Sequence, residues 1–368
     1  MAGPPEITIR TLTDGGQQPP AIADAIVAFV GAARRTLDLA LYDVRLPGEI
    51  GDRVAAALTA AAGRGVAIRL IYNYDDAYRV PVPPPPQTVP EIIEALGLPT
   101  RAIPGKPDLM HHKYLVRDGE AVWTGSTNWT LDSWTREENV IVTVASPELA
   151  AAFTEDFRQL WEKGDVERSG FVEPAPVAVG DATVRAWFSP GRGTALSHRI
   201  AAAIDRATRL RIASPVITAA PILATLAETV SEPGTDLAGV VDHTQMLQVV
   251  GQWHANGNAS WKVPLLERVL EWGGFSGKRS TPYAPGAVHD YMHAKVTVAD
   301  DTVFVGSYNL SRAGTLNAEN VLEIEHGGIA GELAAFIDEV RARYPKADIP
   351  GDHGGEDPAA PLPGPPAR

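Results

Sequence analysis

Two histidine–lysine pairs in this chain have the residue types and spacing to act on a phosphodiester. His111 and Lys113 stand two residues apart in HHKYLVRD, as His293 and Lys295 do in HAKVTVAD. Alternate side chains of a strand share a face, so each pair is expected to point into one cleft. The ammonium groups can neutralise a bound phosphate, and an imidazole near neutrality can act as nucleophile or acid.

These pairs belong to an internal repeat. Residues 110–128 read MHHKYLVRDGEAVWTGSTN, and residues 292–309 read MHAKVTVADDTVFVGSYN. His, Lys and Asp recur after 182 residues, and Asn and Glu recur after 181. The candidate site residues are His111, Lys113, Asp118, Ser126, Asn128 and Glu138 in the first copy, and His293, Lys295, Asp300, Ser307, Asn309 and Glu319 in the second. The doubling predicts one site shared by two similar halves.

The doubled set suits in-line displacement at phosphorus. The two lysines, with Asn128 and Asn309, supply donors to the non-bridging oxygens. One histidine attacks phosphorus to form a phosphohistidine, the other protonates the leaving oxygen, and water or an alcohol then reverses the process. We expect neither a metal nor another cofactor, because the lysines neutralise the phosphate.

The other motif residues are expected to support this pair. Glu138 and Glu319 are placed to hold a histidine by its second ring nitrogen. The Asp residues of the motifs are expected to brace the motif loop rather than touch the substrate. A hairpin after each His-Lys pair would bring Ser126 and Ser307 beside it, together with the asparagines.

The elements that must position these motifs alternate between strands and helices in both halves. Residues 21–44 and 197–217 each read as an amphipathic helix followed by an apolar strand. Ile68–Tyr74 and Leu237–His243 read as the next buried strands. Prolines at positions 90 and 264 mark helix starts. The predicted fold is α/β, with two similar lobes of mixed sheets flanked by helices and a pseudo-two-fold axis between them.

The domain boundaries follow from composition along the chain. The first lobe is expected at 1–172 and the second at 173–347, with a disordered Pro- and Gly-rich tail at 348–368. The Pro-rich stretch 80–86 is expected to be extended. Polar, Gly- and Asn-rich Trp253–Trp261 reads as a loop near the cleft and a specificity element. Arg192 and Lys278 are candidates to reach an anionic headgroup.

The overall composition narrows the functional class. The 368 residues are 45% hydrophobic and 21% charged, which is typical of a soluble globular protein. The absence of cysteine excludes disulfides, thiolate nucleophiles and Cys-ligated metals. There is no apolar signal core or membrane-length stretch, so we expect a cytoplasmic protein. The net charge of −13 disfavours nucleic acid as a partner without excluding it.

The pattern HxKxxxxD followed by GSxN, present twice, resembles the phospholipase D superfamily. The resemblance implies an active site at the lobe interface, with His111 as nucleophile and His293 as general acid. The second copy ends in the family's usual NAEN, whereas the first has REEN, with Arg136 where Asn is expected. Glu137 is therefore an alternative to Glu138.

The function expected from these motifs is a phosphoric diester hydrolase of phospholipase D type, which hydrolyses or transfers a phospholipid or smaller diester. An endonuclease of the same superfamily is the alternative, and a non-catalytic binding module is a remote one. Peripheral membrane contact is compatible with a lipid substrate. A monomer can complete the site, because both motifs lie in one chain.

Overall fold

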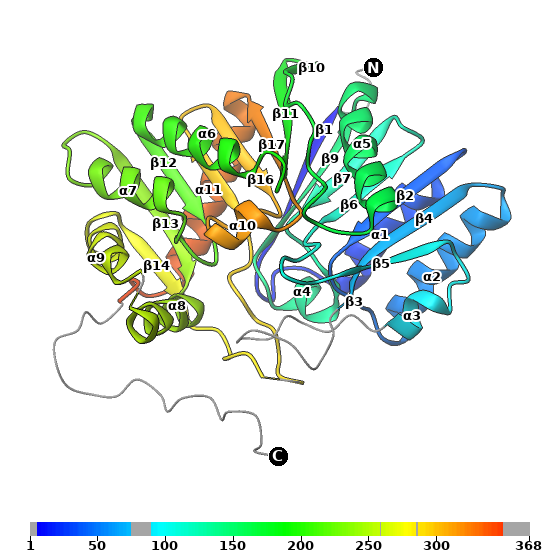
Figure 1. Cartoon of the computed structure of the whole chain (residues 1–368), viewed down its shortest axis with the longest axis horizontal. Coiled ribbons are helices and arrows are strands. Elements are labelled where there is room, and N and C mark those ends of the chain that lie inside the picture. Colours follow the sequence, from blue (N-terminus) through cyan, green and yellow to red (C-terminus); the bar gives the residue numbers. More distant parts are fainter. Residues whose placement is uncertain (1–5, 75–89, 258, 285, 349–368) are drawn as a thin grey trace.

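The computed structural model describes residues 6–74, 90–257, 259–284 and 286–348, which form two α/β lobes side by side (Figure 1). The predicted extended stretch 80–86 and, apart from residue 348, the predicted disordered tail lie outside the described residues. The predicted boundary between residues 172 and 173 falls in the connection between helix α5 (Pro147–Lys163) and strand β10 (Val177–Val179).

The N-terminal lobe is built on a seven-stranded mixed sheet in the order β1-β9-β7-β6-β2-β4-β5. Strand β4 runs parallel to β2 and β5, and the other neighbours are antiparallel. The strands are β1 (Ile7–Leu12), β2 (Thr36–Leu41), β4 (Ala67–Tyr74), β5 (Thr100–Pro104), β6 (Lys113–Arg117), β7 (Ala121–Gly125) and β9 (Asn139–Ala145). The other helices of this lobe are α1 (Pro19–Gly31), α2 (Gly48–Gly63), α3 (Pro90–Glu94) and α4 (Leu131–Thr135). Short strands β3 (Val44–Arg45) and β8 (Trp129–Thr130) pair separately.

The C-terminal lobe repeats this topology in an eight-stranded sheet, β10-β11-β17-β16-β15-β12-β13-β14. From β17 to β14 the strand directions match those from β9 to β5. The strands after β10 are β11 (Ala182–Ser189), β12 (Arg209–Ala213), β13 (Asp236–Asp242), β14 (Phe275–Lys278), β15 (Val296–Ala299), β16 (Thr302–Gly306) and β17 (Glu319–Glu325). The helices are α6 (Gly193–Arg206), α7 (Ala220–Thr229), α8 (His243–Asn256), the 3₁₀ turn Ser260–Lys262, α9 (Val263–Trp272), α10 (Arg312–Leu316) and α11 (Gly327–Arg343). The predicted pair of similar α/β lobes is thus confirmed.

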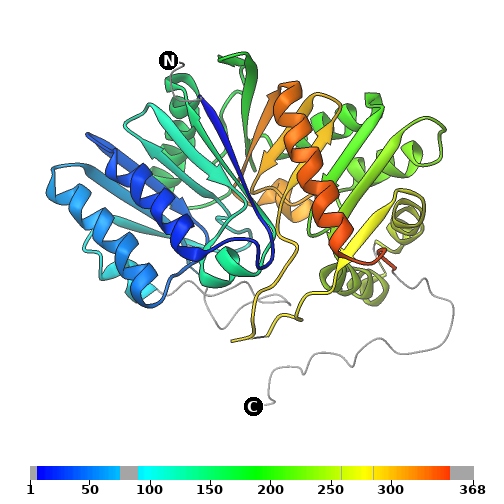
Figure 2. The same cartoon turned by 180° about the vertical axis from the view of Figure 1, so that it is seen from behind.

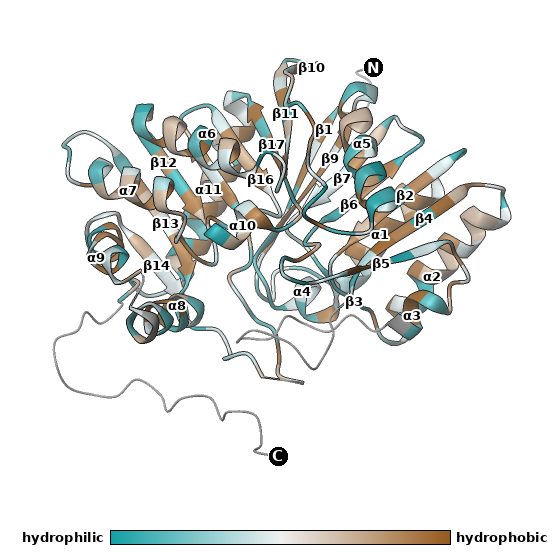
Figure 3. Ribbon diagram, in the orientation of Figure 1, coloured by the Kyte–Doolittle hydropathy of each residue, from teal (hydrophilic) through white to brown (hydrophobic). Residues whose placement is uncertain are grey.

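The two sheets share a central core. Helices α5 and α11 lie between the sheets and contribute Phe153, Phe157 and Phe336 to one cluster that both sheets line (Figures 1 and 2). Helices α1 and α2 cover the outer face of the first sheet, and α6, α7 and α9 cover that of the second. Apolar strands lie between helices whose outer faces are polar (Figure 3). Because the lobes share one core, the seam between them is rigid enough to position a site.

Two hairpins confirm the predicted strand–turn–strand arrangement of the motifs. In the first copy, β6 and β7 are joined by three residues, since Arg117 pairs with Ala121. In the second, β15 and β16 are joined by two, since Ala299 pairs with Thr302. This difference in loop length explains why the repeat offset falls from 182 to 181. Among the described residues, no helix is both long and apolar enough to span a membrane.

Candidate active site

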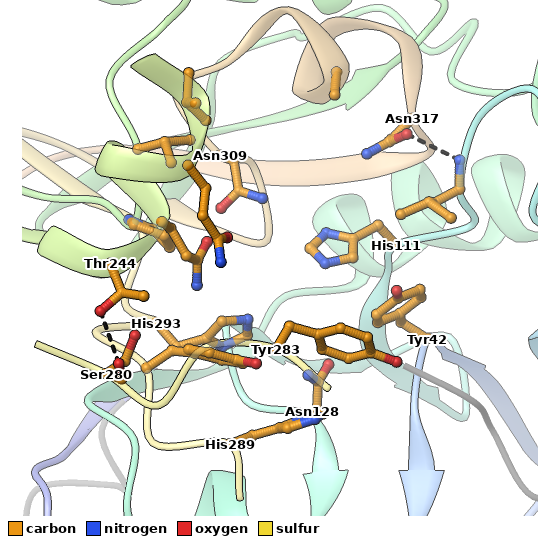
Figure 4. Close-up of a pocket in the computed structure, with 18 of the residues that line it drawn as sticks. Tyr42, His111, Asn128, Thr244, Ser280, Tyr283, His289, His293, Asn309 and Asn317 are labelled. Carbon is orange, nitrogen blue, oxygen red and sulfur yellow. Dashed lines mark hydrogen bonds between the residues drawn. The ribbon is translucent and has the colours of Figure 1, made fainter. Parts of the chain in front are cut away.

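The two motif histidines line one pocket of about 410 Å³ at the seam between the lobes (Figure 4). Each histidine segment crosses to the opposite lobe. The His111 amide donates to the Ala318 carbonyl over 2.9 Å, and the His293 amide donates to the Glu138 carbonyl over 3.2 Å. These reciprocal backbone bonds place residues 182 positions apart on opposite sides of the same space.

The imidazoles are held by different partners. His111 Nδ1 lies 2.7 Å from Glu319 Oε2, as the sequence predicts. His293 Nδ1 lies 3.0 Å from Asn139 Oδ1, and Glu137 Oε2 is 3.4 Å away. In both cases the contact is made by the opposite lobe and leaves Nε2 as the ring nitrogen available to a substrate.

The predicted contact between Glu138 and a histidine is wrong, and the register of the strands shows why. The Ser126 amide donates to the Val140 carbonyl, and the Ser307 amide donates to the Asn320 carbonyl. The equivalent residues Val140 and Asn320 are therefore 180 positions apart. The offset falls from 181 to 180 because three residues connect α4 to β9, whereas two connect α10 to β17. This register matches Asn139 with Glu319, and Glu137 with Asn317.

The one-residue shift turns Glu138 away from the pocket. Its carboxylate accepts from Lys278 Nζ at 3.0 Å and from the hydroxyl of Tyr344. Lys278 also lies 3.2 Å from Asp14 and donates to the Arg136 carbonyl. The predicted role of Lys278 at an anionic headgroup is therefore wrong, because this lysine links the lobes.

Arg192, the other candidate for an anionic headgroup, lies away from the pocket as well. Its guanidinium pairs with Glu173 at 2.6 Å, and it is absent from the pocket lining. The structure gives it no route to a substrate there.

The motif lysines are buried beside the histidines. Lys113 and Lys295 are 2% and 3% exposed, and each donates to the carbonyl of the histidine two residues before it. Burial lowers the pKa of Lys113 to about 7. Burial, and then the charge of Lys113, lowers the pKa of Lys295 well below its usual value. An anion bound next to these ammonium groups would raise both pKa values again.

The same burial acts on the other ionisable groups of the site. It lowers the pKa of both His111 and His293 well below the usual value, with the lysines adding to the effect. It also raises the pKa of Glu137 and of Glu319 to about 7. Perturbed groups concentrated around one pocket are typical of a catalytic site. The described residues contain no group of three or more His, Cys, Asp or Glu side chains arranged to hold a metal ion.

The motif serines and asparagines divide into two roles. Ser126 Oγ donates to Asn139 Oδ1 at 2.7 Å, and Ser307 hydrogen-bonds to Glu319, so both serines orient the partners of the histidines. Asn128 and Asn309 line the pocket itself. Within the described part of the chain, the buried amide oxygen of each asparagine has no hydrogen-bond partner. These amides are polar groups left for a ligand or water.

The motif aspartates do not reach the pocket, in agreement with the expected bracing role. Asp118 accepts the backbone amides of Arg34, Arg35 and Thr36 at 2.7–3.0 Å. Asp300 does the same for the amides of Thr208, just before β12, and of Arg209, the first residue of β12. Both residues have a positive φ. Each aspartate ties its hairpin turn to the start of the neighbouring strand.

Replacing Asp118 with Ala is expected to lower the free energy of unfolding by about 1–3 kcal/mol, because three backbone donors lose a charged acceptor. Alanine at this positive φ adds strain. Turnover per folded molecule should stay within about twofold, because the side chain is remote from the pocket. Urea unfolding and a steady-state assay measure the two effects. Unchanged stability together with lost turnover would contradict the assignment.

Much of the pocket wall comes from residues without a counterpart in the repeat. The segment 279–291 places Tyr283, His289 and Tyr291 along one side. His289 Nδ1 also lies 3.3 Å from Arg45 of the other lobe. The matching segment of the first copy, 105–109, is much shorter, and this length difference is the one sequence signal that could have revealed the wall.

Helix α8 supplies another wall. Its residues Gln245, Gln248 and Gln252 line the pocket together with Thr244. The predicted loop Trp253–Trp261 is largely wrong, since α8 continues to Asn256 and residues 260–262 form the 3₁₀ turn. The earlier turns of α8 line the pocket, whereas the described residues of 253–261 contribute nothing to its lining.

Comparison with known proteins agrees with this geometry. The family model described as "Cardiolipin synthase, PLD-like domain" matches residues 26–161 and 198–341. Cardiolipin synthase A of Citrobacter koseri is 24% identical over 93% of this chain and 71% of that protein. Mitochondrial cardiolipin hydrolase of Xenopus laevis is 30% identical over 39% of this chain and 63% of the hydrolase. The chain spans 55% of the corresponding hydrolase of Chlamydomonas reinhardtii, at 26% identity over 36% of this chain.

Solved structures show the same fold. Phosphatidylserine synthase of Haemophilus influenzae superposes with a TM-score of 0.59 at 14% identity, over 91% of this chain and 86% of that one. The family model covers both lobes, and each lobe contributes one histidine and one lysine to the seam. The chain therefore belongs to the phospholipase D-like family that this cardiolipin synthase model describes.

Proposed function

We propose that this protein is a phospholipase D-type enzyme that cleaves or transfers a phosphodiester through a phosphohistidine on His111. One observation carries the proposal: two imidazoles from different copies of the motif line one pocket, beside two buried lysines. Neutral imidazoles, held through Nδ1, suit attack through Nε2.

In the first step, His111 Nε2 forms a bond to phosphorus while the bond from phosphorus to the leaving oxygen breaks. His293, protonated at Nε2, gives its proton to that oxygen. The negative charge of the bound diester offsets the two lysines and so favours protonation of His293. In the second step, His293 accepts a proton from water or an alcohol, whose oxygen attacks phosphorus and releases His111.

The charge on the phosphoryl oxygens builds next to Lys113 and Lys295. A bound anion raises the pKa of both lysines, so they are charged when the substrate is present. The asparagines in the pocket lining, Asn128 and Asn309, can donate to the same oxygens through Nδ2. No step in this sequence requires a metal ion.

A phospholipid is the substrate class we propose. The matched relatives are described as cardiolipin synthase A and mitochondrial cardiolipin hydrolase, and both names refer to a phospholipid. Among the residues that the structure describes, the pocket lining carries Lys106 but no arginine. A groove for a nucleic acid backbone would need several basic side chains in a row.

The test is an assay of wild type and the His111→Ala variant against phosphatidylglycerol vesicles, single-stranded DNA and bis(p-nitrophenyl) phosphate, each with and without EDTA. We expect turnover of the lipid and the chromogenic diester, unchanged by EDTA and lost in the variant. Cleavage of DNA alone would favour a nuclease, and loss of turnover in EDTA would contradict the metal-free mechanism.

A further inference from the structure

The carboxylate and the amide that hold the histidines exchange places between the two copies. In the second copy, Glu319 contacts the imidazole, and Asn317 stands behind it and donates Nδ2 to Glu319 Oε1 over 3.3 Å. In the first copy, Asn139 makes the shorter contact with the ring at 3.0 Å, and Glu137, 3.4 Å from the same nitrogen, accepts Asn139 Nδ2 over 3.1 Å. A sequence alignment of the two copies does not reveal this exchange. It pairs Glu138 with Glu319, whereas the extra residue before β9 makes Asn139 the structural equivalent of Glu319.

From this exchange we infer that Asn139, with Glu137 behind it, positions His293 as the proton donor, whereas Glu319 positions His111 as the attacking nitrogen. The inference rests on the proposed function and adds a physical reason why one histidine is the nucleophile and the other the proton donor. All three residues are positioning residues, since each acts through an imidazole.

Hydrogen bonds fix the order of the two groups in the first copy. Ser126 Oγ donates to Asn139 Oδ1, which orients that oxygen toward His293. Asn139 Nδ2 donates to Ser133 Oγ at 3.1 Å and to Glu137. Ser133 Oγ in turn donates to Glu137 Oε2 at 2.7 Å. A flipped amide would lose these bonds, so the oxygen of Asn139 is the atom that faces the ring.

The two arrangements stabilise a charged imidazole differently. A carboxylate bonded directly to Nδ1–H stabilises the positive charge that develops on His111 as its Nε2 attacks phosphorus. An amide oxygen orients the same tautomer but stabilises an imidazolium less, so the proton on His293 Nε2 is given up more readily. Glu137 Oε2 lies 3.4 Å from His293 Nδ1, compared with 2.7 Å between Glu319 and His111, and its charge is shared with Ser133 and Asn139.

The two lysines do not distinguish the rings. Lys113 and Lys295 oppose protonation of both histidines. His112 adds a smaller repulsion at His111, where a backbone hydrogen bond with Ser307 acts in the opposite direction. His111 and His289 add smaller repulsions at His293. The direct partner of Nδ1, a carboxylate for His111 and an amide for His293, is the geometric difference on which the inference rests.

The experiment exchanges the groups of the first copy by the double substitution Glu137→Gln and Asn139→Asp, which places a carboxylate on His293 as in the second copy. Two diesters are compared, one releasing p-nitrophenolate, which leaves without a proton, and one releasing an alkyl alcohol, which needs one. We expect kcat for the alkyl diester to fall about tenfold more than kcat for the nitrophenyl diester, because only the former depends on an acid.

The corresponding variant of the second copy is Glu319→Gln. It removes the carboxylate that supports attack by His111, so kcat should fall by the same factor for both diesters. Glu325→Gln is the matched control, because Glu325 lies on the same strand but pairs with Arg185 at 2.7 Å. It should leave both rates unchanged. Thermal unfolding of every variant shows whether the fold is kept.

A second measurement needs no variant. Wild type quenched during turnover of a ³²P-labelled diester should carry the label on His111, located by peptide mapping. Label on His293 would overturn both the inference and the assignment of His111 as the nucleophile in the proposed function. An exchange variant that slows both diesters equally would overturn the inference and leave the proposed function in place. Absence of turnover of either diester by wild type would instead remove the proposed function itself.

Discussion

Replacing His111 with Asn is expected to lower turnover by at least about 10⁴-fold, because the attacking nitrogen is lost and no covalent intermediate can form. Replacing His293 with Asn should have a different result. The first step with a nitrophenyl diester needs no acid, so the phosphohistidine still forms, but the second step lacks the base that activates water. The expected outcome is a burst of one p-nitrophenolate per enzyme followed by very slow release.

Rapid-mixing measurement of p-nitrophenolate distinguishes these outcomes. The His111 variant should show neither burst nor steady state, whereas the His293 variant should show a burst whose amplitude equals the enzyme concentration. The variant His198→Asn serves as a control, because this histidine is absent from the pocket lining. A burst in the His111 variant and none in the His293 variant would reverse the roles.

Replacing Lys113 with Met is expected to lower kcat/KM for an anionic diester by about 10²–10³-fold, because a preorganised cation facing the phosphoryl oxygens is lost. Burial lowers the pKa of Lys113 to about 7. A lysine is charged below its pKa, so the free enzyme loses this charge as the pH rises through 7. In wild type, kcat/KM should therefore fall on the alkaline side of pH 7.

The parameter kcat should fall only at a higher pH, because the bound anion raises the pKa of the lysine. Measurement of kcat and KM between pH 5.5 and pH 9.5, in wild type and in the Lys113 variant, tests both statements. Lys163→Met provides the control, since Lys163 lies in the exposed last turn of α5. Identical alkaline limbs for kcat and kcat/KM in wild type would contradict the lysine assignment.

The sequence by itself determined the features of this protein that depend on local pattern. Hydrophobic periodicity and apolar runs are local, so the alternation of strands and helices and the hairpins of both motifs were predictable. The internal repeat was sufficient to predict two similar lobes. It was also sufficient to predict the meeting of His111 and His293, because residues at equivalent places in facing lobes lie near the axis that relates them.

Only the tertiary structure decided which side chains support those histidines. Successive residues of a strand point to opposite faces, so an error of one residue in register replaces every side chain that faces the site. The extra residue after α4 makes this change, and it brings Glu137 and Asn139 to His293 while Glu138 joins Lys278. The pocket walls from α8 and from residues 279–291 likewise required the structure, because their sequences lie outside the repeated motif and reach the site only through the packing of the two lobes.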